Sequence, residues 1–232
     1  MSYTPTIPST ELTFVTSPLF VQARQEIEYL RRWYCRATDL FGMTGDADAN
    51  AEARRIYHRI FTPEASVQVT GATAKPLAAI GPDGWAAVVM KALNDYVVTQ
   101  HLAGTQIVDI RTLQTSTDAR GQDQIVEGTA GMTSYLQAWH VWPDNRLRLV
   151  MGNYVDEVLF VPGTGWQIRA MNLVHLSAEV RQLGPIGADP TSHDIEKFFS
   201  SPVAGRSSQL AVCAPRLVCH VCTPVGFHVF LC

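Results

Sequence analysis

The strongest chemical signal in the sequence is a histidine within the stretch TQHLAGTQIVDI, residues 99–110. His101 stands where a helix-like run gives way to a strand-like run, although a strand that only had to pack would favour Val or Ile there. An imidazole titrates near neutral pH and can accept and return a proton within one reaction cycle. His101 is therefore a candidate catalytic base. The alternative is a histidine that only hydrogen-bonds the backbone at a helix–strand junction.

Two further residues could cooperate with His101. Asp39 lies in the last turn of a predicted helix, where the negative end of the helix dipole disfavours a carboxylate unless a partner such as a protonated histidine offsets it. His140 lies near the end of a long predicted strand and shares a strand face with Leu136 and Ala138. It could act as a general acid opposite the base. A solvated aspartate and a strand-end histidine are the respective alternatives.

Four other residues are candidates for contacts with a ligand. Tyr154 and Asn153 are neighbours on a predicted strand, so they point to opposite faces and at most one of them can line a pocket. Tyr34 on the first predicted helix and Trp139 on a long predicted strand complete the set. For Tyr154, the alternative is an exposed pair with Asp156 on the same strand face.

The bulk composition favours a globular domain that binds a small molecule or another protein. The chain has 232 residues, of which 47% are hydrophobic and 17% charged, with a formal net charge of -3. This length suggests one domain, or one domain with tails. No basic stripe indicates nucleic acid as a partner, and no apolar run reaches the roughly 18 residues of a membrane span.

Cysteine usage and the N-terminus predict a cytoplasmic protein. The opening MSYTPTIPSTELTF has neither the basic nor the apolar region of a signal peptide. Four of the five cysteines lie in the last twenty residues, unlike the spread of a disulfide-stapled secreted domain. Among them, Cys219 and Cys222 have the C-x-x-C spacing of a zinc site, but no second pair follows. We expect no metal and no cofactor.

The hydrophobic pattern predicts three helices followed by long strands. Apolar residues recur at steps of three and four in the ranges 18–42, 49–61 and 81–97. Alternation predicts strands over 65–71, 99–112, 124–142, 147–161 and 165–178. This order implies an α+β fold, a curled antiparallel sheet with helices gathered on one face. We expect an extended arm over 1–17, the domain over 18–180 and an irregular extension over 181–232.

The motifs within these elements resemble SnoaL-like domains of the NTF2-like superfamily. YCRATDLFG and IFTPEASVQVTG resemble the opening of that domain, and TQHLAGTQIVDI resembles the entry to its third strand. GNYVDEVLFVPGTGWQIRAMNLVHLS resembles the closing hairpin. The likeness spans residues 18–178 and implies a cone in which three helices and the curled sheet enclose one pocket. It also implies a homodimer.

Within the superfamily, the scytalone-dehydratase-like branch is the nearest in its functional residues. That branch has TQH at the third-strand entry, an aspartate at the end of the first helix and a second histidine on the next strand. These positions fall on His101, Asp39 and His140. The resemblance implies that Asp39 orients His101, which removes a proton. The enzyme would be a dehydratase, isomerase or cyclase acting on a polyketide- or terpenoid-like molecule in secondary metabolism.

Two other functions use the same fold. One is a non-catalytic module for small-molecule binding or dimeric assembly, and the other is the small structural subunit of a ring-hydroxylating oxygenase. The enzyme hypothesis requires the Asp39 carboxylate to lie within hydrogen-bond reach of His101, whereas a pure binder or scaffold would have these groups apart.

Overall fold

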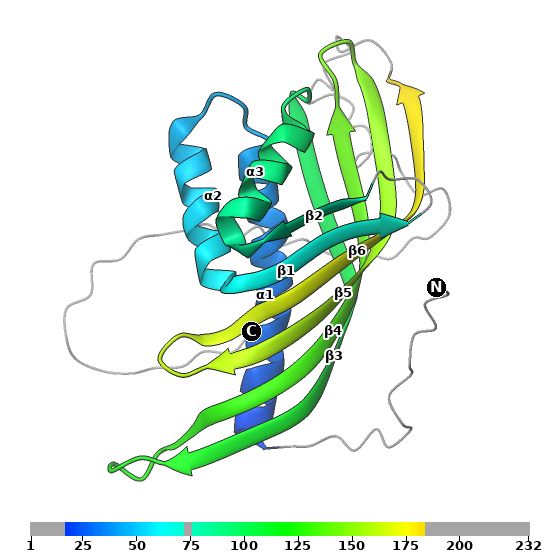
Figure 1. The fold of residues 1–232 in the computed structure, drawn as a ribbon. Coiled ribbons are helices and arrows are strands. Elements are labelled where there is room, and N and C mark those ends of the chain that lie inside the picture. The colour runs from blue at the N-terminus through cyan, green and yellow to red at the C-terminus, as the bar shows by residue number, and fades with distance from the viewer. Residues whose placement is uncertain (1–16, 72–75, 184–232) are drawn as a thin grey trace, which may run out of the picture. The chain divides into compact units, whose positions relative to one another are not determined.

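The computed structural model describes residues 17–71 and 76–183 (Figure 1). The elements in chain order are α1 (Pro18–Phe41), α2 (Ala47–Ile60), β1 (Phe61–Gly71), β2 (Leu77–Ile80), α3 (Gly81–Leu93), β3 (Val98–Thr117), β4 (Asp123–Val141), β5 (Arg146–Val161) and β6 (Gly165–Gln182). Three helices and a curled sheet confirm the α+β prediction. No helix of the described ranges is long and apolar enough to cross a membrane.

The chain divides into two compact units, Met1–Gly187 and Ala188–Cys232. All described residues belong to the first unit. The predicted arm up to residue 16, and the predicted extension from residue 184 with its cysteine motif, lie outside the described residues.

The six strands form one sheet in the order β2-β1-β6-β5-β4-β3. The strands from β3 to β6 follow one another through tight turns and pair antiparallel, as predicted. In contrast to the prediction, β1 pairs with β6 in parallel, with Ser66 opposite Ala170. The two strands are distant in the chain, so no hairpin dictates their relative direction. The helices α1, α2 and α3 lie on one face of the curved sheet (Figure 1).

The predicted helices and long strands are present, with shifted ends. β2 was not predicted, because four residues with mostly exposed side chains give no readable alternation. β3 continues five residues beyond its predicted end. The register shift between Ile110 and Thr112, followed by mostly exposed side chains, breaks the alternation there.

Helix α1 buries one face, and its C-terminal end contacts β3. Pro18 occupies its first turn, where a missing backbone N–H is harmless. Gly42 caps its C-terminus, and a Cβ atom at this position would overlap the side chain of Thr99. The absence of a side chain at Gly42 therefore lets the end of α1 approach the start of β3.

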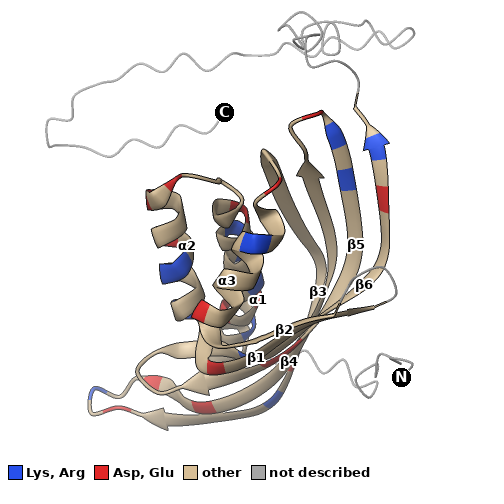
Figure 2. Ribbon diagram, turned by 45° about the horizontal axis from the view of Figure 1, so that its top comes forward, with Lys and Arg blue, Asp and Glu red and all other residues tan. Residues whose placement is uncertain are grey.

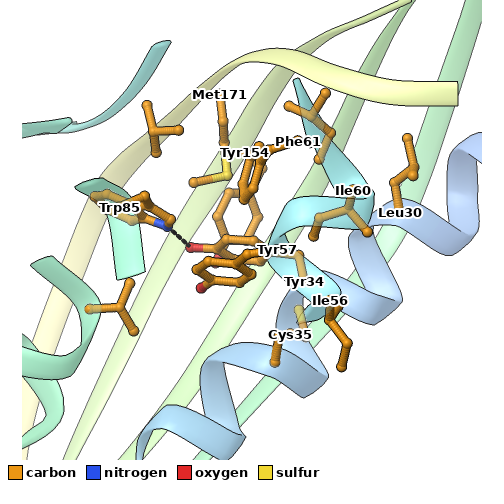
Figure 3. Packing of buried hydrophobic residues seen from close by; sticks show 14 of the residues in the cluster. Leu30, Tyr34, Cys35, Ile56, Tyr57, Ile60, Phe61, Trp85, Tyr154 and Met171 are labelled. Carbon is orange, nitrogen blue, oxygen red and sulfur yellow. Dashed lines mark hydrogen bonds between the residues drawn. The ribbon is translucent and has the colours of Figure 1, made fainter. Parts of the chain in front are cut away.

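The centre of the core is a cluster of aromatic rings between α1, α2 and the sheet (Figure 3). Tyr34 of α1 stacks on Tyr57 of α2 with ring centroids 5.6 Å apart and an interplanar angle of 2°. Phe61 and Tyr154 meet Tyr34 edge-on at 6.0 and 5.6 Å. Such ring pairs contribute about 0.5–1.5 kcal/mol each beyond the burial of their area.

A fully buried ion pair connects α1 to β5. The Nη2 of Arg31 donates a hydrogen bond to Oδ2 of Asp156, and both side chains have no exposed surface. The guanidinium also lies 3.6 Å from the centroid of the Tyr154 ring. Because a buried charge is costly without its partner, this pair fixes how α1 sits on the sheet.

We predict that Arg31→Met destabilises the fold by about 3–5 kcal/mol, because it leaves the Asp156 carboxylate buried without a partner. The double variant Arg31→Met/Asp156→Leu should recover most of that loss. Urea unfolding followed by circular dichroism measures both. The matched control is Arg32→Met, which removes a surface ion pair with Glu28 and a contact with the exposed ring of Tyr29, and should change stability by less than about 1 kcal/mol. A loss that small for Arg31→Met alone would contradict the anchoring role.

Candidate active site

A cavity of about 420 Å³ lies between α3 and the helix-facing side of the sheet. This volume is in the usual range of about 300–1,000 Å³ for small-molecule sites. Its apolar lining comes largely from α3 and the neighbouring strands: Val69, Leu77, Trp85, Val88, Val89, Ala92, Leu93, Leu136, Ala138, Val150 and Leu173. Its polar lining consists of Tyr34, Thr38, Tyr96, His101, His140, Arg148, Tyr154 and His175.

Asp39 and His101 form a hydrogen-bonded pair at the edge of this cavity. The Oδ1 of Asp39 lies 2.7 Å from Nδ1 of His101. The backbone N–H of His101 donates to the other carboxylate oxygen, at 3.1 Å. An ionised carboxylate can only accept, so Nδ1 donates to Asp39, and the neutral form of the ring then has its lone pair on Nε2. This is the contact that the enzyme hypothesis requires.

The local fold explains why Asp39 meets His101. Asp39 lies in the last turn of α1, and Gly42 lets that end of the helix approach the first residues of β3. Thr99, two residues before His101, adds a hydroxyl hydrogen bond to Asp39 at 3.3 Å. The carboxylate near the negative end of the helix dipole is thus compensated by three donors.

His140 lies beside His101 within the sheet. The two rings are 5.2 Å apart and nearly perpendicular, and the ring of Tyr96 packs on the other side at 4.8 Å. Burial, followed by the charges of His101 and Arg148, lowers the pKa of His140 to about 3. Its imidazole is therefore neutral at neutral pH, and it can offer an N–H hydrogen bond but holds no acidic imidazolium proton.

The four predicted ligand contacts divide between the two faces of the sheet. Tyr154 and Tyr34 line the inner end of the cavity, where the indole N–H of Trp85 donates to the Tyr34 hydroxyl at 3.3 Å. Trp139 and Asn153 alternate with cavity residues and lie on the opposite face. The prediction that at most one of Tyr154 and Asn153 lines the pocket is consistent with this arrangement.

Four polar residues of the cavity were not predicted from the sequence: Thr38, Tyr96, Arg148 and His175. For Arg148 a signal existed, because it is an even number of residues from Tyr154 on the same strand and so shares its face. For His175, counting residues along the strand was a weaker guide to the side-chain face, because a register shift interrupts the pairing of β6 with β5. Within the described ranges, no three His, Cys, Asp or Glu side chains converge as metal ligands.

A second, wider hollow of about 520 Å³ lies elsewhere on the domain. It is lined by residues of α1 and of the sheet hairpins, including Tyr29, Trp33 and Trp166. It contains neither histidine nor any acid–base pair. The chemistry therefore favours the cavity beneath α3 as the functional site, despite its smaller volume.

Comparison with known proteins gives one family and one fold. Residues 21–172 match the sequence model of the SnoaL-like domain. A provisionally named scytalone dehydratase of Novosphingobium aromaticivorans has a similar structure, with 18% identity and a TM-score of 0.50; the match covers 73% of this chain and 96% of that chain. This likeness supports the predicted NTF2-like cone. No curated protein sequence matches the chain significantly.

Two further solved structures are similar at lower scores. The hexachlorocyclohexane dehydrochlorinase LinA-type3 of Novosphingobium barchaimii is 12% identical, with 72% of this chain and 97% of that chain covered and a TM-score of 0.48. The beta subunit of a provisionally assigned aromatic-ring-hydroxylating dioxygenase of Novosphingobium aromaticivorans is 14% identical, with coverages of 71% and 96% and a TM-score of 0.46. At such identities the likeness concerns the fold alone.

The lowered pKa of His140 predicts a specific loss of stability in acid. Between its ordinary pKa of 6.5 and about 3, the unfolded chain binds a proton at this residue that the folded chain does not. The free energy of unfolding should therefore fall by about 2–3 kcal/mol through His140 as the pH drops from 7 to about 4.5.

Urea unfolding of the wild type and of His140→Gln at both pH values measures this contribution. Between pH 7 and about 4.5, the free energy of unfolding of the variant should fall by about 2–3 kcal/mol less than that of the wild type. His58→Gln, which changes an exposed histidine of α2, is the matched control and should behave as the wild type. Equal losses in the wild type and His140→Gln would contradict the prediction.

Proposed function

The chain belongs to the SnoaL-like family, and we propose that it is an enzyme that removes a proton from a small organic molecule without a cofactor. The observation that carries this proposal is the Asp39–His101 pair at the wall of an apolar cavity. A hydrogen-bonded carboxylate and imidazole beside a ligand-sized space is the arrangement of a general base with its orienting partner.

In the proposed reaction, Nε2 of His101 takes a proton from a carbon next to a carbonyl or an activated ring. Asp39 holds the imidazole in the required tautomer and stabilises the imidazolium that forms. The low-dielectric surroundings strengthen this stabilisation, because the His101 side chain is only 8% exposed. The neutral imidazole of His140, 5.2 Å away between ring centroids, offers a hydrogen bond to a developing enolate oxygen or a leaving hydroxyl.

Proton removal of this kind begins dehydration, isomerisation and cyclisation alike. We propose one of these three reactions on a polyketide- or terpenoid-like substrate of secondary metabolism. The apolar side chains of α3, including Trp85 and Val89, suit a ring-containing ligand of this class. Tyr34 and Tyr154 close the inner end of the cavity and are proposed substrate contacts.

We also propose that the chain forms a homodimer through the face of the sheet that carries no helices. Large apolar side chains are exposed on that face, among them Leu102, Tyr135, Trp139 and Met151. Each alternates with a side chain that points toward the helices. Several large exposed apolar side chains on one face are typical of protein interfaces. A non-catalytic assembly module would use the same face and would lack the proton-transfer activity.

The proposed base is tested by hydrogen–deuterium exchange at the acidic C–H positions of 2-tetralone, a ring ketone of suitable size, followed by NMR in deuterium oxide. The wild type should accelerate exchange, and His101→Ala should reduce the acceleration by about a hundredfold or more. Asp39→Asn should also reduce it, because the amide can no longer accept the Nδ1 proton in the same geometry and stabilise the imidazolium.

His58→Ala is the matched control, since His58 is an exposed histidine of α2 and should leave exchange unchanged. The imidazole proton between His101 and Asp39 offers a second readout, because it should be strongly deshielded in the wild type and lost in Asp39→Asn. Exchange that is equal in the wild type and in His101→Ala, with no such proton, would favour the binding-module alternative.

The homodimer is tested by analytical ultracentrifugation. Trp139→Glu places a charge on the helix-free face of the sheet and should shift the protein from dimer to monomer, while its circular dichroism spectrum stays unchanged. Tyr29→Glu changes an exposed aromatic residue of α1 and should leave the dimer intact. A wild-type protein that sediments as a monomer would contradict the proposed homodimer.

A further inference from the structure

Arg148 has an unusual environment for a charged residue of this chain. It lines the cavity and is only partly exposed, and its one hydrogen bond runs from Nη1 to the hydroxyl of Tyr96 at 3.3 Å. None of the ion pairs within residues 17–71 and 76–183 includes it. The only carboxylate among the dyad and cavity residues, Asp39, is already bonded to His101.

The other arginines of the described ranges show how exceptional this is. Arg36, Arg59 and Arg120 also lack an ion pair, but they are exposed and water solvates them. Arg146, two residues before Arg148 on β5, is exposed and pairs with Asp144. Figure 2 shows the basic residues of β5 at the opposite end of the strand from its acidic residues. A partly buried guanidinium without a counter-charge is unfavourable unless something else balances it.

Two histidines beside Arg148 add unused hydrogen-bonding capacity. His140 is the cross-strand neighbour of Arg148, and His175 of β6 also lines the cavity. Within the described part of the chain, the Nδ1 atoms of both histidines are buried and have no hydrogen-bond partner. His140 as a whole is only 7% exposed. Burial, and then the charge of Arg148, lowers the pKa of His175 as well.

These residues make the part of the cavity around Arg148 positive and rich in hydrogen-bonding nitrogen, whereas α3 lines the cavity with apolar side chains. We propose that the substrate is a ring-containing organic acid whose carboxylate is bound by Arg148, with His140 and His175 as further polar contacts. The guanidinium fork matches the two oxygens of a carboxylate. This inference deepens the proposed function and relies on it only for the cavity as the place where substrate binds.

The spacing of the strands sets the size of this acid. Arg148 lies two strands across from His101 and two residues along, because His140 pairs with both Thr99 and Arg148. With about 4.8 Å between strands and 3.4 Å per residue, their Cα atoms are on the order of 12 Å apart. Both side chains point into the same cavity, so one or two fused rings can reach from the guanidinium to the imidazole of His101. Arg148 is thus assigned as the residue that determines specificity and holds the reacting carbon near the base.

Calorimetric titration of the full chain with matched pairs of probes tests this assignment. The probes are benzoate, 1-naphthoate and 2-naphthoate, each compared with its neutral amide. At least one acid should bind about tenfold more tightly than its amide. In Arg148→Met the preference should fall below about twofold, and Arg148→Lys should retain part of it because a cation remains.

Arg146→Met is the matched control, since it removes an exposed arginine of the same strand and should preserve the preference. His101→Ala should abolish proton exchange yet still prefer the acid, so loss of the base and loss of the anion site are separable. Equal binding of every acid and its amide, or no binding of any acid, would overturn the proposal while leaving the base intact. A preference that persists in a folded Arg148→Met would overturn it too.

Discussion

The buried pair of Arg31 and Asp156 is the constraint on which the rest of the domain depends. Both charges are fully removed from water, so α1 can rotate or slide on β5 only by breaking an ion pair in a low-dielectric core. Asp39 follows Arg31 by eight residues, or about 12 Å along the helix axis. Fixing α1 at Arg31 therefore fixes where the helix ends and where its last carboxylate meets β3.

The cavity combines a polar surface and an apolar surface. The sheet contributes charged and polar groups from neighbouring strands, among them His101, His140 and Arg148. Helix α3 contributes an apolar wall of Trp, Val and Leu side chains. Electrostatic interactions are stronger beside such a wall than in water. Burial, together with the charges of His101 and Arg148, lowers the pKa of His140, so that its neutral ring is a hydrogen-bonding group in this site.

Much of the site was predictable because its chemistry coincides with simple periodicity. The position of Asp39 late in a helix and that of His101 at a strand entry suggested a pair, and the structure brings the two together. Arg148 was not predicted because it is notable for having no carboxylate partner in the cavity, and a sequence does not show which charges lie close together in space. The parallel pairing of β1 with β6 was missed for a related reason, since only strands joined by short turns reveal their partners.

That parallel pairing also governs how the domain can be made on the ribosome. Ser66 pairs with Ala170, roughly a hundred residues later in the chain, and closing so long a loop is slow. At about 5–20 residues per second, the helices and β1 emerge many seconds before β6. During that interval the apolar face of α1 has no sheet to cover it, and β1 has one unpaired edge. Newly made chains therefore pass through an aggregation-prone stage. Chaperones, the rate of synthesis and the concentration of new chains should affect the yield of folded protein more than they affect the stability of the finished fold.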